Sequence, residues 1–432
     1  MAMIDSLVGK LVRKGQLTVV FANGSERSFG PGGEPSLRVR MADRRVAFDI
    51  ARNPRVGVGE AFMDSRIVVE NGDILDLLRL VVGANRWEDQ DSGRRALNKG
   101  KRRWPSLFRR NDAKSSRRNV AHHYDVGNDL YRLFLDSDLQ YSCAYFTDPS
   151  NSLEQAQSDK KAHIAAKLYL KPKQTVLDIG CGWGGTALYL NRVADVDVLG
   201  VTLSEEQLKV ARQRARDAGV SDRVKFELID YRSLTGKFDR IVSIGMFEHV
   251  GAAHFDEFFL TCRDLLADDG VMVLHTIGKY GKASTPDPFT DKYIFPGYHL
   301  PSISQLAAST ERARLITSDL EILRLHYAYT LQHWYDRAVA ARAKIVELHD
   351  DRFYRMWIFY LAGGIVAFEG GSMCNYQAQY VRDRTALPIT RDYMIEAERR
   401  YRKLDEAARP AAKAKAKTTA KRAPMQRAGA RP

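Results

Sequence analysis

The stretch "VLDIGCGWGG", Val176–Gly185, decides the fold of this 432-residue chain. It has the order of a short apolar strand, a glycine-rich turn and the start of a helix, with Asp178 just before the turn. Because glycine has no Cβ, such a turn bends sharply and lets the backbone come close to a ligand. A glycine turn alone is a weak signal. Its position between a strand and a helix predicts a ligand site at the carboxyl end of a parallel strand.

Apolar and helical segments alternate along the chain from about residue 120 onward. The apolar segments after "VLDIGCG" are "DVLGVTL", "RVKFELID", "DRIVSIG" and "VMVLHTI", with helical patterns such as "SEEQLKVARQRARDAG" between them. This alternation predicts an α/β fold with a doubly wound, mostly parallel sheet, followed by extra helices after residue 300. The longest uncharged apolar segment, Met356–Phe368, has thirteen residues. It is shorter than the roughly 20 residues that cross a bilayer, so we expect a buried helix.

The N-terminal residues 1–90 have the pattern of a small α+β domain. Asn23-Gly24 between two strand-like segments is a hairpin signal, "LRVRM" alternates like a half-buried strand, and "DILDLLRLVV" has helical spacing. We expect this domain to pack against the catalytic domain or against a second subunit, so a homodimer stays open. We expect a basic linker over residues 91–119, the catalytic domain over 120–405, and a disordered basic tail over 406–432.

The net charge of +14 is concentrated in two segments. Residues 94–118 contain eleven Lys or Arg and one acid, and residues 407–432 contain eight and none, which leaves the rest of the chain at −4. Such segments bind nucleic acid or anionic lipid, or are solvated tails. The four cysteines form no CxxC pair and no zinc spacing. We therefore expect a reducing, cytoplasmic setting and no metal site. The N-terminal stretch "MAMIDSLVGKLVRKG" lacks a long apolar run, so we expect no signal peptide.

The glycine turn and its surroundings resemble those of class I S-adenosylmethionine (AdoMet)-dependent methyltransferases. A dinucleotide site would have the spacing GxGxxG with an acid about 20 residues further along. Here "GVTLSEEQ" places Thr202 at the end of the second strand. The resemblance therefore implies AdoMet rather than a nicotinamide cofactor, with Thr202 in place of the acid that usually binds the ribose hydroxyls.

Longer motifs resemble the cyclopropane fatty acid synthase family, which includes the mycolic acid cyclopropane synthases. They extend over about residues 120–400 and are "HHYDVGNDLYRLFLDSDLQYSCAYF", "IVSIGMFEHVG", "VLHTI", "IFPGYHLPS" and "LHYAYTLQHW". The resemblance implies that a cis double bond of a phospholipid acyl chain attacks the methyl group of AdoMet. A carbocation forms, bound bicarbonate removes a proton, and a cyclopropane ring closes. The expected partner is the anionic inner face of a membrane, which the basic segments would bind peripherally, and not nucleic acid.

The same resemblance assigns two sets of site residues. The catalytic, bicarbonate-binding set is Cys143, Glu248, His275, the main chain of Ile277, and Tyr327. The AdoMet-binding set is Tyr141, Ser142, Gly180, Gly182, Thr202, Gln207 and Tyr231. Many family members carry a cysteine in the C-terminal helix, but "YLAGG" has Gly364 there, and Cys374 is ten residues further on. We therefore expect no covalent role for that cysteine.

The catalytic set is chemically coherent for a carbocation in a dry pocket. Negative charge and aromatic faces stabilise a cation, but a carboxylate in direct contact would trap it. A small buried anion held by a thiol, an imidazole, a phenol and a backbone N–H is a safer base, and Glu248 can accept its proton. Composition alone would make Cys143 a packed core thiol, whereas the motif favours a functional one.

Two other outcomes stay open. The carbocation could shift a hydride and lose a different proton, which would leave a methyl-branched unsaturated chain. The basic tail also fits an RNA or protein methyltransferase, or a binding module on the same fold, although we find no RNA-binding motif.

Overall fold

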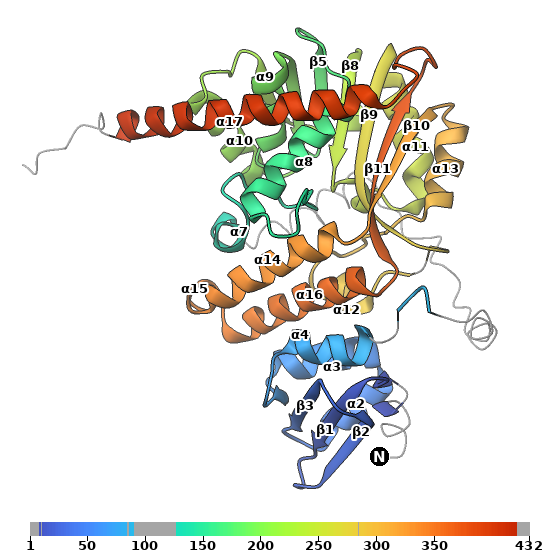
Figure 1. Cartoon of the computed structure of the whole chain (residues 1–432), viewed down its shortest axis with the longest axis vertical. Helices are drawn as coiled ribbons and strands as arrows, with labels where there is room; N and C mark the ends of the chain where they lie inside the picture. Colours follow the sequence, from blue (N-terminus) through green and yellow to red (C-terminus); the bar gives the residue numbers. More distant parts are fainter. Residues whose placement is uncertain (1–7, 10, 84–85, 90–126, 284, 421–432) are drawn as a thin grey trace, which may run out of the picture.

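The computed structural model describes residues 8–9, 11–83, 86–89, 127–283 and 285–420, without the side chains of residues 409–420. A large domain is built on a seven-stranded sheet and a small domain on a four-stranded sheet (Figure 1). A layer of helices separates the two sheets. This architecture confirms the predicted doubly wound α/β fold preceded by a small α+β domain.

The large sheet has the strand order β10-β11-β9-β8-β5-β6-β7. Its strands are β5 (Thr175–Ile179), β6 (Asp197–Thr202), β7 (Val224–Leu228), β8 (Phe238–Ile244), β9 (Leu266–Lys279), β10 (Ile316–Leu323) and β11 (Met373–Val381). The five strands from β9 to β7 are parallel, whereas β11 pairs antiparallel with β9 and β10. Strand β5 is buried on both faces from its second residue onward, as expected for a parallel strand covered by helices on either side.

Helices cover both faces of the large sheet. One face packs against α8 (Leu153–Lys167), α9 (Gly185–Ala194), α10 (Glu205–Asp217) and α17 (Asp392–Ala420), and the other against α11 (Phe255–Leu265) and α13 (Ile303–Arg312). Successive residues of a strand point to opposite faces, so Val176 belongs to the first core and Leu177 to the second.

A third layer lies beyond the carboxyl ends of the parallel strands. Its helices are α7 (Asn128–Phe134), α12 (Pro288–Tyr293), α14 (His326–Ala340), α15 (Arg342–Leu348) and α16 (Asp351–Glu369). The short 3₁₀ turns η3 (Tyr231–Ser233), η4 (Phe247–His249) and η5 (Ala252–His254) follow strand ends of the large sheet. The predicted buried helix Met356–Phe368 lies within α16, where Trp357 and Ile365 are almost inaccessible. That prediction is confirmed.

The small domain contains β1 (Gly15–Val20), β2 (Glu26–Gly32), β3 (Ser36–Met41), β4 (Ile67–Val69), the helices α2 (Arg45–Arg52), α3 (Pro54–Met63) and α4 (Ile74–Leu78), and the π-helical turn η1 (Arg79–Gly83). The Asn23-Gly24 hairpin between β1 and β2 is confirmed. Asp73 caps α4, and its carboxylate accepts from the backbone N–H of Asp76 at 2.9 Å. Strand β1 alternates between buried and half-buried residues, so one face of the sheet forms the core of the domain.

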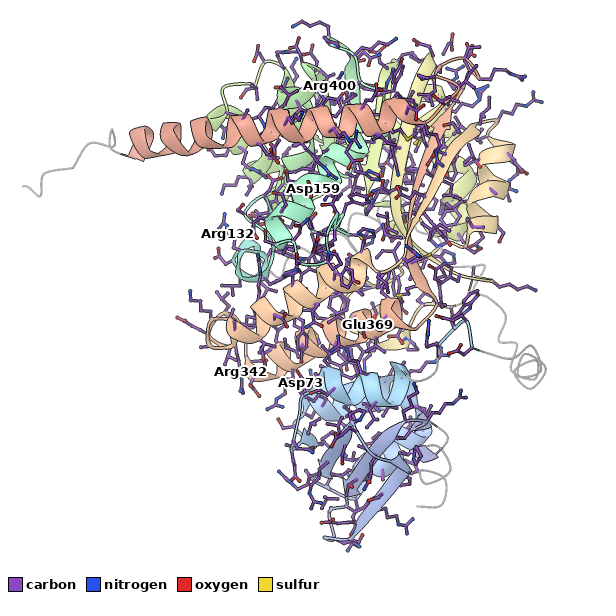
Figure 2. All side chains as sticks on the ribbon, in the orientation of Figure 1. Asp73, Arg132, Asp159, Arg342, Glu369 and Arg400 are labelled. Carbon is purple, nitrogen blue, oxygen red and sulfur yellow. The ribbon has the colours of Figure 1, made fainter. Side chains whose placement is uncertain are left out.

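The small domain packs on α12, α14 and α16 of the catalytic domain, which is one of the two arrangements that the sequence left open. Polar contacts surround the interface: Tyr335 Oη donates to Asp73 Oδ2 at 2.9 Å, and Arg79 pairs with Glu369 at 2.7 Å. Figure 2 marks Asp73 on the small domain and Glu369 at the end of α16. Since such partly exposed pairs each contribute only about 0–1 kcal/mol, the apolar centre of the interface provides most of its stability.

The C-terminal segment differs from the prediction. Helix α17 continues to Ala420 (Figure 1), so the tail predicted to be disordered from residue 406 is helical over its first part. Its repeated Ala and Lys residues have high helix propensity, which composition-based reasoning underweighted. The predicted basic linker, residues 91–119, lies entirely outside the described residues. Among the helices in the described ranges, none is long and apolar enough to span a membrane.

Candidate active site

A first pocket, of about 140 Å³, lies at the carboxyl ends of β5, β6 and β8. Every residue that the sequence assigned to AdoMet binding lines it. These residues are Tyr141, Ser142, Gly180, Gly182, Thr202, Gln207 and Tyr231. The Thr202 hydroxyl donates to Gln207 Oε1 at 3.1 Å, which holds two of them side by side. Segments far apart in the sequence therefore meet in one pocket.

Two glycines, which have no side chain, leave open space on the wall of this pocket. Gly180 and Gly182 have φ angles of +82° and +54°, a region that favours glycine. A Cβ added at Gly182 would meet no atom within 4 Å, so the space beside it is free for a ligand. A Cβ added at Gly180 would lie 2.7 Å from Met246 Cβ.

We expect Gly180→Ala to raise the Kd for AdoMet about tenfold or more, because backbone strain and a steric clash cost about 1–3 kcal/mol. Isothermal titration calorimetry measures the effect. Gly219→Ala is the matched control, since Gly219 also has a positive φ, of +70°, but its added Cβ would meet nothing within 4 Å. An equal loss of affinity in both variants would contradict the assignment.

The loop Gln140–Phe146, "QYSCAYF", lies between the pocket and helix α8. Gln157 Nε2 donates to the carbonyl of Ser142 at 2.9 Å, and Lys160 Nζ donates to Ser142 Oγ at 2.9 Å. Lys160 is completely buried, and this burial lowers its pKa to about 7. Sequence reasoning missed Lys160, because a lysine in a helix is most often solvated.

Asp178 supplies an unpartnered acceptor to the same pocket. Its side chain is buried, and its Oδ2 has no hydrogen-bond partner among the described residues. Burial raises the pKa of Asp178 to about 7, against the lowering effect of the Lys160 ammonium. A buried acceptor beside open space suits a ligand with an amino group and a positive charge, and AdoMet has both. The residues present therefore fit AdoMet.

A second and larger cavity, of about 580 Å³, adjoins the first pocket. Tyr141, Ser142, Gly245 and His249 line both, so the two spaces meet across these residues. Most of the wall of the larger cavity is aliphatic or aromatic. Its polar residues beside the shared wall include Cys143, Glu248, His275 and Asn375.

Glu248 is the buried carboxylate of this cavity. Its Oε1 accepts from the backbone N–H of Ile277 at 2.6 Å, while its Oε2 has no hydrogen-bond partner among the described residues. Burial raises its pKa to about 7. The main-chain N–H of Ile277, expected to hold bicarbonate, donates to Glu248 instead, because η4 lies beside the end of β9. That expectation is corrected, although Ile277 does line the cavity.

The pKa of Glu248 predicts how its removal changes stability with pH. Between pH 4.5 and about 7 the native state keeps a proton that the unfolded chain releases. The stability contributed by this carboxyl is therefore full below pH 4.5 and is lost as pH rises through about 7. We compare the free energy of unfolding of Glu248→Gln with that of the wild type at pH 4.5 and at pH 8. We expect the difference, variant minus wild type, to be larger at pH 8 by on the order of 3 kcal/mol. Urea unfolding at both pH values measures it, and a pH-independent difference would contradict the assignment.

His275 is held between two amides of β11. Asn375 Nδ2 lies 2.7 Å from its Nε2, and Gln377 Nε2 lies 3.0 Å from its Nδ1. Burial lowers its pKa well below the usual value, so the ring is neutral. A neutral imidazole has one N–H, so one amide donates to it and the other accepts through its oxygen.

Sequence reasoning missed these two amides. In "CNYQAQY" polar residues alternate with aromatic and small ones along a buried strand, and this alternation is the signal that could have found them. Asn375 also lines the cavity.

Cys143 and Tyr327 complete the predicted catalytic set on the cavity wall. The buried Cys143 thiol donates to the carbonyl of Ala144 at 3.3 Å, and burial raises its pKa far above the usual range. A protonated thiol is a hydrogen-bond donor rather than a nucleophile. The Tyr327 ring packs on Phe368, with their centroids 4.8 Å apart.

The structure also shows the position of Gly364, which stands where many family members have a cysteine. Gly364 lines the cavity, whereas Cys374 lies in the core on the face of the sheet that α11 and α13 cover. Cys374 therefore does not take the place of the missing cysteine.

Residues 111–378 match the family described as mycolic acid cyclopropane synthetase. The chain belongs to this family. It is an AdoMet-dependent methyltransferase of the cyclopropane-fatty-acyl-phospholipid synthase type. Residues 5–86, which include the small domain, match a second family, described as a domain of unknown function.

Three relatives illustrate the similarity. The enzyme is 36% identical over 385 residues to a probable fatty acid methyltransferase of Pseudomonas putida, across 86% of this chain and 94% of that protein. It is 44% identical over 260 residues to the cyclopropane-fatty-acyl-phospholipid synthase of Escherichia coli K12, across 60% of this chain and 66% of that protein. The crystal structure of mycolic acid cyclopropane synthase CmaA1 complexed with SAH and CTAB has a TM-score of 0.58 at 34% identity, across 61% of this chain and 97% of that one.

Proposed function

We propose that the enzyme transfers a methylene unit from AdoMet to the cis double bond of an unsaturated acyl chain in a membrane phospholipid, forming a cyclopropane ring. One observation carries the proposal. The AdoMet pocket meets a large apolar cavity across Tyr141, Ser142, Gly245 and His249. A hydrocarbon chain gains from burial in such a cavity, whereas a nucleic acid or a charged peptide would lose its hydration there.

The residues of the enzyme align the alkene, exclude water and stabilise charge. AdoMet, when bound, supplies the methyl group that the double bond attacks. Tyr141 stacks on Trp334 with ring centroids 5.1 Å apart, and Tyr327 lies edge-on to the same Trp334 at 5.8 Å. Tyr141 and Tyr327 both line the cavity, so their ring faces are placed to stabilise a carbocation on the acyl chain.

We propose bicarbonate as the base that removes the proton. Glu248 Oε2 is a buried acceptor without a hydrogen-bond partner among the described residues, and Glu248 lines the cavity together with the Cys143 thiol. Bicarbonate has an O–H that such an acceptor binds, and its oxygens can accept from the Cys143 thiol in place of the Ala144 carbonyl. Its bound form supplies a basic oxygen, and the Glu248 carboxylate accepts the proton that it releases.

The two basic segments support a membrane-surface substrate. Each Lys or Arg close to anionic lipid contributes about 1 kcal/mol of binding, and residues 94–118 alone have eleven of them. We therefore propose peripheral binding of the enzyme to the inner face of the membrane.

Fatty acid analysis after expression in a bacterial host without its own synthase tests the proposed function. We expect saturated chains with a cyclopropane ring to replace part of the monounsaturated chains. A methyl-branched chain that keeps its double bond would favour C-methylation without ring closure. An unchanged lipid profile, with the enzyme present and AdoMet bound, would overturn the proposal. A host that expresses Glu248→Ala is the control.

A further inference from the structure

The large cavity does not end in the catalytic domain. Its far wall consists of apolar side chains from the small domain, among them Leu17, Val19, Val39, Met41, Ile67 and Leu77. All six are buried from solvent. On β1 and β3 such residues alternate with more exposed ones, so they form the inner face of the sheet. Protein cores seldom leave voids larger than a water molecule, and a cavity here is therefore space built for an apolar occupant.

We propose that the small domain is an acyl-binding module: it holds the methyl-terminal part of the acyl chain while the double bond lies beside Glu248. This inference rests on the proposed function, because the acyl chain is the ligand. The polarity of the wall sets the direction of the chain. A charged headgroup among Val19, Val39 and Met41 would lose its hydration without a partner, whereas the hydrocarbon end is stabilised there.

The interface fixes the small domain relative to the catalytic groups. A Cβ added at Gly59 of α3 would lie 2.5 Å from Phe289 Cε2 and 2.8 Å from Phe359 Cε1, so only glycine lets α3 pack this closely. Both rings line the cavity. Around them, Glu60 accepts from Lys292 and from Tyr293 Oη, each at 2.6 Å. The depth of the cavity from Glu248 is therefore set by the fold, and it limits the length of chain beyond the double bond.

Small residues of α16 keep the cavity open beside this interface. Gly363, Gly364 and Ala367 line it, spaced so that they share one face of the helix. A Cβ added at Gly363 would meet no atom within 4 Å, and its φ is not positive. A larger side chain at Gly363 consequently has room only in the cavity.

The test varies only the part of the chain beyond the double bond. Palmitoleoyl and oleoyl chains have the same number of carbons from ester to double bond, and the oleoyl chain has two more methylenes beyond it. Their kcat/KM values are measured on vesicles of dipalmitoleoyl- or dioleoyl-phosphatidylglycerol. We expect Val19→Phe to lower the oleoyl-to-palmitoleoyl ratio of kcat/KM about tenfold or more, because pocket size discriminates between methylenes by that amount.

Thr18→Phe is the matched control, since Thr18 is the neighbouring residue on the opposite face of β1, where its hydroxyl contacts Ser28 Oγ at 3.0 Å. We expect it to keep the wild-type ratio. Gly363→Leu, which fills the cavity from α16, should lower the ratio as well, and Val39→Phe on the same inner face of the small domain replaces Val19→Phe if that variant does not fold.

The outcomes separate the two proposals. A wild-type enzyme that modifies neither lipid refutes the proposed function and this inference with it. A wild-type enzyme that modifies both lipids, with unchanged ratios in the cavity variants, overturns the acyl-binding role of the small domain alone.

Discussion

Glu248→Ala lowers the turnover of the enzyme by about a hundredfold or more, the magnitude of a lost acid–base group, while AdoMet binds as in the wild type. Glu248 lines the large cavity but not the AdoMet pocket. Its Oε2 is the buried acceptor that we propose takes the proton from bicarbonate. Alanine removes this acceptor and also the partner of the Ile277 N–H. Initial rates on phospholipid vesicles and calorimetric titration with AdoMet measure the two quantities.

Two further variants make this result specific. Glu311→Ala removes an exposed carboxylate on α13, and we expect it to keep the wild-type rate. Glu248→Gln keeps the shape of the side chain and can still accept from Ile277, so its rate reports on the lost carboxylate alone. A Glu248→Ala rate within a few-fold of the wild type would show that proton transfer does not pass through this residue.

Depletion of bicarbonate lowers turnover by about a hundredfold, because the reaction then lacks its base. The assay uses carbon dioxide-free buffer under inert gas, and added bicarbonate restores the rate in a saturable way. Acetate or formate at the same concentration serves as the control, since neither has an O–H for Glu248 to accept from at neutral pH.

The same titration separates two roles of Glu248. If Glu248 relays the proton from bicarbonate, added bicarbonate does not restore the rate of Glu248→Ala. A wild-type rate that is equally high in depleted buffer would instead assign the base to a group of the protein, and the proposed role of bicarbonate would be wrong.

Much of the fold was predictable because local patterns determine it. Runs such as "VLDIGCG", followed by a glycine turn, are typical of strands covered on both faces, and their alternation with helices predicts a parallel sheet. The Asn23-Gly24 hairpin and the buried helix at Met356–Phe368 were equally predictable from local sequence. The helical start of the C-terminal segment was not, because lysine and alanine are common both in disordered tails and in helices.

The residues of the candidate site were predictable, but the hydrogen bonds between them were not. Motifs identified Glu248 and His275, and the structure places both on one cavity wall. The partner of Ile277 N–H, the amides of Asn375 and Gln377, and the buried Lys160 depend on contacts between segments far apart in the sequence. No local pattern encodes such contacts. The continuity of the cavity with the small domain is likewise a property of tertiary packing alone.

Ring closure is the central claim, and AdoMet with a fully deuterated methyl group tests it most directly. The purified enzyme is incubated with this AdoMet and dioleoyl-phosphatidylglycerol vesicles, and the product chains are analysed by mass spectrometry and proton NMR. We predict chains that retain two of the three deuterium atoms, have no double bond and show cyclopropane signals. Product chains that retain all three deuterium atoms, or that keep a double bond, would contradict cyclopropane formation.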